Sequence, residues 1–396
     1  MDLDDFTKCY LCLGLRINQH INGYVEHYYG PSEFKDLIKA EGKVSPIKLI
    51  QDCKNLICQL KEQGFEEKRQ RFLEKTLVGI QTILRILNGE KIPYLEQVEK
   101  LFDFKPRLQN DNFFFDLTSQ AEKIYKGDGN LSNRIKNYAQ RRIVPPKNIK
   151  ILMLKAINIA KKRTIELFPD LLPLNEKVIL NEVKDKSWPM YNWYLGNYTS
   201  KIDINISTIY YWTSLLNFAC HEGYPGHHME SAVRDLLLFH NKGYFETSIL
   251  MIYTPEMVIH EGLGELAERI LFNPSESNKI LLDEFCPNPS IEDDIETLIK
   301  QNKIRDGFRV FNYNLAYYKY VKGWNDDELT KYSRDFKVIP EIGIKAMLRF
   351  ISDKIWAPYI PVYQGERLII EKFGKEPTPR QFQELMVNQT LPSDLV

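Results

Sequence analysis

The sequence has no excess of charge and no long apolar run. Lysine plus arginine and aspartate plus glutamate each total 53 in 396 residues, so the formal net charge is zero. Without a global basic field, we expect no binding to nucleic acid or to an anionic membrane surface. No segment approaches the roughly 20 consecutive apolar residues of a membrane-spanning helix. These absences argue against nucleic-acid-binding proteins and membrane-embedded proteins.

Signals for secretion and for disulfide bonding are also missing. Residues 1–6 read MDLDDF, which is acidic and lacks the basic and apolar stretches of a signal peptide, so we expect a cytoplasmic protein. The six cysteines are scattered, and the single CxxC pair, Cys9 and Cys12, has no second half. Apolar neighbours place this pair in a helix core, and we expect reduced, mostly buried thiols.

Apolar residues recur at helical spacing along most of the chain, and no linker rich in proline, glycine or serine divides it. Between residues 171 and 205, three short alternating or β-branched stretches indicate a small antiparallel β region. We therefore expect a mainly α protein with one domain over residues 1–396, and we allow for two lobes, about 1–170 and 171–396, around a central cleft. The expected helices cover residues 6–28, 46–60, 65–87, 95–102, 131–142, 145–168, 229–239, 245–253, 255–270, 291–321, 326–336, 340–351, 362–373 and 378–387, and the expected strands cover 177–180, 191–195 and 201–205.

The segment 220–230, CHEGYPGHHME, contains three of the seven histidines. In the short zinc motif HExxH, two histidines one helical turn apart bind the metal and the glutamate between them is the general base. His221 and Glu222 match the start of this motif, but Pro225 stands where the second histidine belongs. The candidates for the second ligand are therefore His227 and His228.

On a straight helix, His228 would share the face of His221 but would lie about 10 Å away along the axis, too far for both to bind one ion. Pro225 lacks a backbone donor and Gly226 is conformationally free, so we expect the helix to bulge or break there. Such a deformation would bring His227 beside His221. We therefore expect His227 as the second ligand and keep His228 as the alternative; the other histidine would contact substrate or an outer partner.

A third ligand is expected from the segment 260–268, HEGLGELAE. Its three glutamates share one helix face, and we expect Glu261 to be the ligand because neighbouring glycines allow another backbone to approach closely. A solvated acidic face is the alternative. Glu265 and His260 are candidates for an outer partner of the metal site.

These residues predict one zinc ion, bound by His221, His227 and Glu261, with an open position for water. Glu222 would take a proton from that water and pass it to the leaving amine. Tyr363, or Tyr359 in the same segment, is expected to stabilise the developing oxyanion, although packing is the commoner role of tyrosine. Candidate groups for binding a substrate carboxylate, each with a surface ion pair as its alternative, are Arg305, Arg309 and Arg349.

The motif His-Glu-x-x-Pro-Gly-His-His at residues 221–228 resembles the signature of the domain-of-unknown-function 885 family. This family is described as zincin-like and distantly similar to helical metallopeptidases such as carboxypeptidase Taq and angiotensin-converting enzyme. Residues 23–31, 260–268 and 363–365 are similar to further family segments. The resemblance implies a mainly helical zincin-like fold, peptidase activity and a third metal ligand at Glu261.

The sequence thus predicts a zinc metallopeptidase, either a carboxypeptidase or an oligopeptidase, that acts on short peptides. An exposed strand edge beside the metal helix would pair with an extended peptide by main-chain hydrogen bonds. The alternatives are a metal-dependent hydrolase of another amide or ester and a non-catalytic helical metal-binding protein. A structural zinc site would need four protein ligands, and Cys220 is the only thiol near enough in sequence to supply one.

Overall fold

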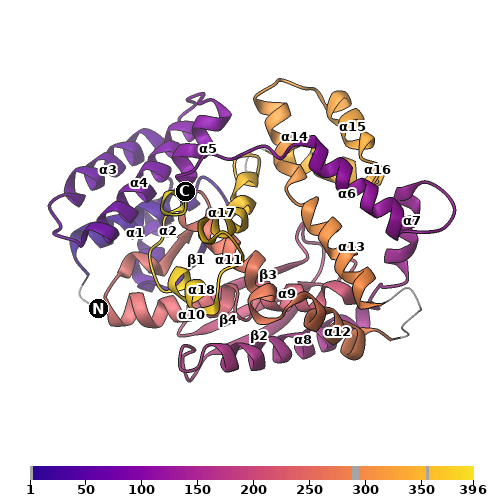
Figure 1. The fold of residues 1–396 in the computed structure, drawn as a ribbon. Helices are drawn as coiled ribbons and strands as arrows, with labels where there is room; N and C mark the ends of the chain where they lie inside the picture. Colours follow the sequence, from indigo (N-terminus) through magenta and orange to yellow (C-terminus); the bar gives the residue numbers. More distant parts are fainter. Residues whose placement is uncertain (1–2, 288–293, 354–355) are drawn as a thin grey trace.

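The computed structural model describes residues 3–287, 294–353 and 356–396, and it is mainly helical, as predicted (Figure 1). Within these ranges no helix combines the length and the apolar character needed to cross a membrane. The helices are α1 (Asp5–Asn18), α2 (Ser32–Glu41), α3 (Pro46–Leu60), α4 (Glu67–Leu87), α5 (Tyr94–Phe102), α6 (Asp111–Ile124), α7 (Leu131–Gln140), α8 (Pro146–Leu167), α9 (Leu215–Glu222), α10 (His227–Arg234), α11 (Glu256–Leu271), α12 (Pro274–Phe285), α13 (Ile295–Gly307), α14 (Phe311–Tyr320), α15 (Asp326–Asp335), α16 (Glu341–Ser352), α17 (Gly365–Phe373) and α18 (Pro379–Met386).

A three-stranded sheet precedes the candidate metal helix, where the β region was predicted. Its strands are β2 (Lys177–Val183), β3 (Met190–Gly196) and β4 (Thr199–Asn205), in the order β2-β4-β3. The expectation of a purely antiparallel region is wrong, because β2 pairs with β4 in parallel while β3 pairs with β4 antiparallel. The chain reverses twice between β2 and β4, which restores its direction before the two strands meet.

A second, two-stranded sheet forms where helices were expected. Antiparallel strands β1 (Val25–Tyr28) and β5 (Ile249–Met251) replace the ends of the predicted helices 6–28 and 245–253. Helix α1 stops early, and Gly23 adopts a positive φ of 81° in the turn that follows it. Each strand is stabilised by a partner more than 200 residues away, so the local apolar period cannot reveal it.

The predicted helix 291–321 begins outside the described residues and is interrupted further on. Its described part consists of α13 and α14, with a break at residues 308–310. Gly307, the last residue of α13, lies so close to α6 that a Cβ atom there would approach Leu117 Cδ1 to 2.4 Å. Glycine is a poor helix former in an interior position, so a helix end at this residue costs little.

One continuous apolar core extends from Leu3 to Leu395, and a smaller one joins α6, α7 and α13. In the view of Figure 1, α1–α5 lie on the left, α6, α7 and α13–α16 lie on the right, and α11 lies between them. Two segments far apart in sequence therefore build the right side of the molecule in this view. The division into lobes near residue 170 stays a prediction.

Candidate metal centre

The helix that carries the His-Glu motif breaks at the predicted place. Helix α9 ends at Glu222, and α10 begins at His227. The Gly226 amide donates to the Cys220 carbonyl at 3.0 Å, and a Cβ atom on Gly226 would lie only 2.0 Å from the His221 carbonyl oxygen. Only glycine is therefore tolerated in this turn, which brings His227 back beside His221.

The structure brings together the three residues predicted as metal ligands. The Nε2 atoms of His221 and His227 are 3.0 Å apart, and His221 Nε2 lies 3.7 Å from Glu261 Oε2. One ligand atom from each residue lies within 4.8 Å of the others. Two imidazoles and one carboxylate are a donor set of catalytic zinc sites. We call these three residues the metal-facing cluster.

Gly264 lets α11 approach the imidazoles, and Gly262 lets it approach the start of α17. A Cβ atom on Gly264 would lie 2.8 Å from His221 Cε1 and 3.0 Å from His227 Cε1, and one on Gly262 would lie 2.7 Å from the carbonyl carbon of Gly365. His221 also forms a hydrogen bond with the Gly264 backbone, which raises its pKa and is therefore donated by the ring. Such a bond fixes the tautomer of a metal-binding histidine and leaves the other nitrogen free for the ion.

Burial determines the protonation of the two imidazoles. It lowers the pKa of His221 to about 3, with the Arg309 charge acting in the same direction, and it lowers the pKa of His227 well below its ordinary value. Both rings are therefore neutral near pH 7, which is the form that binds a metal ion.

Tyr359 supports the third donor. Its hydroxyl donates to Glu261 Oε1 at 2.8 Å, so Glu261 Oε2 remains directed toward His221. Burial raises the pKa of Glu261, while His260 and the Tyr359 hydrogen bond act against that rise. Tyr359 thus acts on Glu261 as an outer partner, whereas the sequence offered this tyrosine only as a candidate donor to the oxyanion.

His228, the alternative ligand, points away from the metal-facing cluster. Its Nδ1 lies 2.8 Å from Ser200 Oγ, and its Nε2 lies 2.8 Å from Glu176 Oε2. This order resembles the Ser-His-acid triad of hydrolases. Both Ser200 and His228 have 0% exposed surface, however, so no substrate reaches the hydroxyl. We call Glu176, His228 and Ser200 the inner network and assign it a structural role.

A second group of possible ligands consists of His227, Glu230 and His260. The His227 and His260 rings are stacked, with centroids 3.8 Å apart and planes 14° apart. Nitrogen lone pairs lie in the ring plane, so two parallel stacked rings cannot direct both of them at one ion. Glu230 Oε2 lies 2.8 Å from His260 Nδ1, and this pair supports the His227 ring from behind.

Glu222 lies buried beside the metal-facing cluster, with 8% of its surface exposed. Burial raises its pKa to about 8, and the charges of Glu261 and Glu26 add to that rise. The side-chain amide of Asn192 on β3 donates to the Glu222 carbonyl oxygen at 2.6 Å, which attaches the end of α9 to the sheet. The predicted general base thus lies among buried carboxyl groups, in surroundings that strongly favour a proton on a carboxylate. We call the region of Glu222, Glu261 and Glu26 the chamber.

Tyr363 and Glu26 face the same chamber. Tyr363, in the 3-10 turn Ile360–Gln364 before α17, keeps 38% of its surface exposed. Burial of its hydroxyl and the charges of Glu261, Glu26 and Glu222 raise the pKa of Tyr363 well above its ordinary value. Sequence reasoning missed Glu26, because it assigned residues 6–28 to one helix; the only signal was its place in the segment 23–31.

The remaining charged candidates are engaged elsewhere. Arg309 forms ion pairs with Glu265 and, at 3.4 Å, with Asp306. Arg305 pairs with the same Asp306 at 3.0 Å, and Arg349 is exposed on α16. The Ser277 hydroxyl donates to Glu268. Of the predicted acidic face, only Glu261 therefore joins the metal-facing cluster. Among the described residues, Cys220 belongs to neither group of possible ligands.

Comparison of the sequence with protein-family models and with curated proteins gave no match. Among solved structures, the chain resembles one described as "the putative lipoprotein from Colwellia psychrerythraea". The two align with a TM-score of 0.51 and 11% sequence identity, over 89% of this chain and 69% of that chain. At this level of identity, the likeness shows that the two chains share an overall fold.

Proposed function

We propose that this protein is a cytoplasmic zinc-dependent hydrolase, namely a metallopeptidase with a zincin-like fold that cleaves short peptides. One observation carries the proposal. His221, His227 and Glu261 present their ligand atoms within 4.8 Å of one another, and the buried carboxyl group of Glu222 follows directly in the chain. Three donors leave a position for water, whereas structural zinc sites are closed by four protein ligands.

The residues present are suited to zinc. The two imidazoles are neutral, the Gly264 backbone fixes the tautomer of His221, and Tyr359 holds Glu261. A zinc ion there would lower the pKa of its water to about 7 and polarise the scissile carbonyl. A nearby dication also lowers the pKa of a carboxyl group, which would bring Glu222 into the range of a general base at neutral pH.

The chain supplies the other steps of peptide hydrolysis. Glu222 would accept a proton from the attacking water and deliver it to the departing amine. The Tyr363 hydroxyl faces the same chamber and would donate a hydrogen bond to the carbonyl oxygen as it gains negative charge. Strand β3, which forms an edge of its sheet and is attached to Glu222 through Asn192, would pair with an extended peptide.

The test combines metal analysis with one conservative substitution. We expect about one zinc ion per chain and cleavage of short peptides by the wild-type protein. Glu222→Gln should retain zinc and lose at least about 100-fold in kcat, since general acid–base catalysis contributes about 10²–10⁴-fold. Glu182→Gln, on the exposed strand β2, is the matched control and should match the wild type.

Other outcomes would point elsewhere. Zinc binding with hydrolysis of esters or other amides, but not of peptides, would indicate a different metal-dependent hydrolase. Zinc binding without any hydrolysis would indicate a metal-binding protein. A protein that binds no zinc, or a Glu222→Gln variant with full activity, would contradict the proposal.

A further inference from the structure

The proposed mechanism leaves one carboxylate of the catalytic chamber without a role. Glu26 is neither in the metal-facing cluster nor in the second group of possible ligands. The Tyr191 side chain is hydrogen-bonded to it, and His260 Nε2 lies 4.0 Å from its Oε1. Its side chain is only 12% exposed. A carboxylate this deep in a protein is costly unless a cation or a proton accompanies it.

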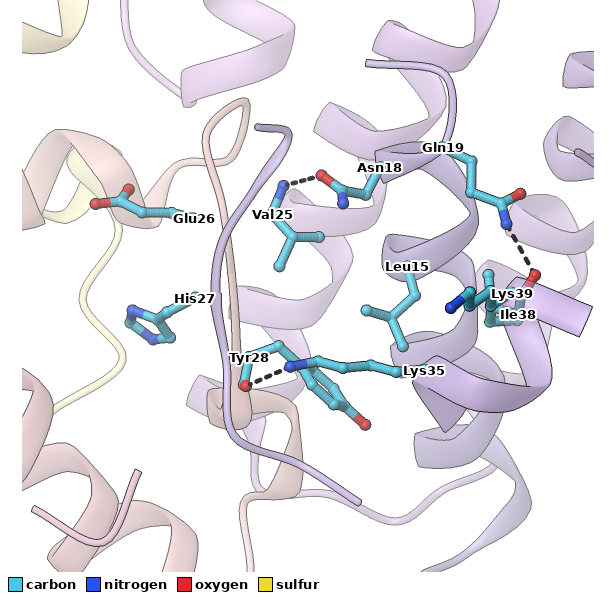
Figure 2. A pocket seen from close by; sticks show the side chains of 10 residues that line it. All are labelled: Leu15, Asn18, Gln19, Val25, Glu26, His27, Tyr28, Lys35, Ile38 and Lys39. Atoms are coloured by element: carbon cyan, nitrogen blue, oxygen red, sulfur yellow. Dashed lines mark hydrogen bonds between the residues drawn. The ribbon is translucent and has the colours of Figure 1, made fainter. Parts of the chain in front are cut away.

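The backbone directs Glu26 into the chamber. The β1–β5 register shifts between Val25 and His27, so Glu26 is the extra residue of a β-bulge. Figure 2 shows the result: the Glu26 and His27 side chains extend to one side of the strand, and Leu15 and Lys35 lie on the other. A cavity of about 430 Å³ borders β1 together with residues of α1 and α2. Bulges occur next to active sites, where they redirect a side chain.

The imidazole of His260 is shared unequally between two carboxylates. Its Nδ1 lies 2.8 Å from Glu230 Oε2, whereas its Nε2 lies 4.0 Å from Glu26 Oε1. Glu230 is therefore the main partner of His260, and no other cation among the described residues lies within ion-pair distance of Glu26. A cationic group of the substrate would supply the missing close partner of Glu26.

From this placement we infer that Glu26 binds the free α-ammonium group of the substrate, which makes the enzyme an aminopeptidase that acts on short peptides. The inference rests on the proposed function and specifies its substrate. The bond between the first and second residues breaks; water adds its hydroxyl group to the acyl carbon, and its proton passes through Glu222 to the departing amine.

The position of Glu26 suits this role. In the first residue of a peptide, the nitrogen is two bonds from the scissile carbonyl carbon, a distance of about 2.5 Å. A carboxylate that holds this nitrogen must therefore flank the metal ligands without joining them, as Glu26 does beside His260 and Tyr191. Recognition of a carboxyl end would need a cation instead. Arg309, the arginine whose charge reaches His221, is already paired with Glu265.

The experiment compares trialanine with N-acetyltrialanine, which lacks the ammonium group. We expect zinc-loaded wild-type protein to cleave trialanine with a kcat/KM at least 10-fold higher, because a hydrogen bond to a charged group contributes about 10–150-fold. Glu26→Gln should lower kcat/KM on trialanine by about the same factor, retain zinc and leave N-acetyltrialanine cleavage unchanged. Glu33→Gln, on the exposed face of α2, removes the same charge elsewhere and should have no effect.

A binding measurement separates recognition from turnover. In zinc-loaded Glu222→Gln protein, titration calorimetry should show trialanine bound at least 10-fold more tightly than N-acetyltrialanine. Adding Glu26→Gln should abolish this difference, whereas Glu26→Asp, which keeps the charge, should retain part of it. If folding of the glutamine variant fails, the aspartate variant still tests the role of the charge.

Several results would overturn the inference. Equal cleavage of both peptides by the wild type would exclude recognition of the ammonium group while leaving the zinc peptidase intact. Loss of a metal ion in Glu26→Gln would make Glu26 a metal ligand instead. A wild-type protein with no zinc and no cleavage of either peptide would refute the proposed function itself, and the inference with it.

Discussion

His227 and His228 are adjacent in the chain but belong to two different assemblies. His227 faces His221 in the metal-facing cluster, and its Nδ1 has no hydrogen-bond partner. His228 lies in the inner network, where both of its nitrogens contact another side chain. Consecutive residues on a helix point about 100° apart, so one histidine faces the chamber and the other faces the sheet. A histidine that faces other ligand-type side chains can bind a metal ion, whereas one with both nitrogens engaged stabilises the fold.

Substitution of His227 should affect zinc affinity, and substitution of His228 should affect stability. The loss of zinc affinity should be the larger effect. We expect His227→Gln to lower zinc affinity by more than about 100-fold, since loss of an outer partner alone costs about 10–100-fold. His228→Gln should keep zinc but lower the free energy of unfolding by about 1–3 kcal/mol, because it leaves buried partners unsatisfied. Zinc titration and urea unfolding measure the two quantities. Equal zinc loss in both variants would remove the distinction between the assemblies.

The inner network should also produce its own pH dependence. Although burial acts to raise it, the pKa of Glu176 is lowered from 4.5 to about 2 by hydrogen bonds from His228, Lys161 and Tyr224. A lowered carboxyl pKa contributes stability that is fully present above pH 4.5 and is lost as the pH falls toward 2. The shift corresponds to about 3 kcal/mol.

This contribution can be measured by urea unfolding of chelator-treated protein between pH 7 and pH 2.5, which keeps metal binding out of the result. Glu176→Gln should flatten the acid part of the profile, and Glu182→Gln should leave it unchanged. An identical acid slope in the wild type and in Glu176→Gln would show that the inner network does not hold Glu176 ionised.

A smaller effect should follow from crowding the metal-facing cluster. In Gly264→Ala the new Cβ atom would meet His221 Cε1 at 2.8 Å and His227 Cε1 at 3.0 Å. Overpacking costs about 1–3 kcal/mol, and we expect it to appear as an approximately 10-fold loss of zinc affinity. Gly343→Ala, a helical glycine on α16, is the control and should bind zinc normally. Normal zinc affinity in Gly264→Ala would mean that the imidazoles can shift without cost.

Much of the metal-facing cluster was predictable because the residues that define it stand close together in the sequence. His221 and Glu222 stand in a known order, and Pro225 with Gly226 makes a straight helix impossible, so the break and the choice of His227 follow from stereochemistry. Glu261 was identified because glycines at nearby positions indicated a close approach between helices. The structure places all of these residues together, although binding of zinc itself stays a prediction.

The errors fall where the stabilising partner is remote in sequence. Strands β1 and β5 were assigned to helices because their apolar period suits either structure, and only their mutual pairing selects the strand. The parallel pairing of β2 with β4 was missed for a similar reason, since strand order is decided by tertiary contacts. Glu26 was overlooked together with β1, because a side chain cannot be assigned to a site while its strand is taken for a helix.

By itself, the sequence determined a mainly helical chain, a broken helix with two histidines and a glutamate, and a second helix that carries Glu261 beside closely spaced glycines. These properties depend on residue type and on spacing of a few positions. Only the tertiary structure decided that His228 is enclosed with Glu176 and Ser200, that Tyr359 supports Glu261, and that a bulge in β1 adds Glu26 to the chamber. Each of these contacts joins residues 28 to 226 positions apart, and long-range contacts of this kind form only once the whole core has packed.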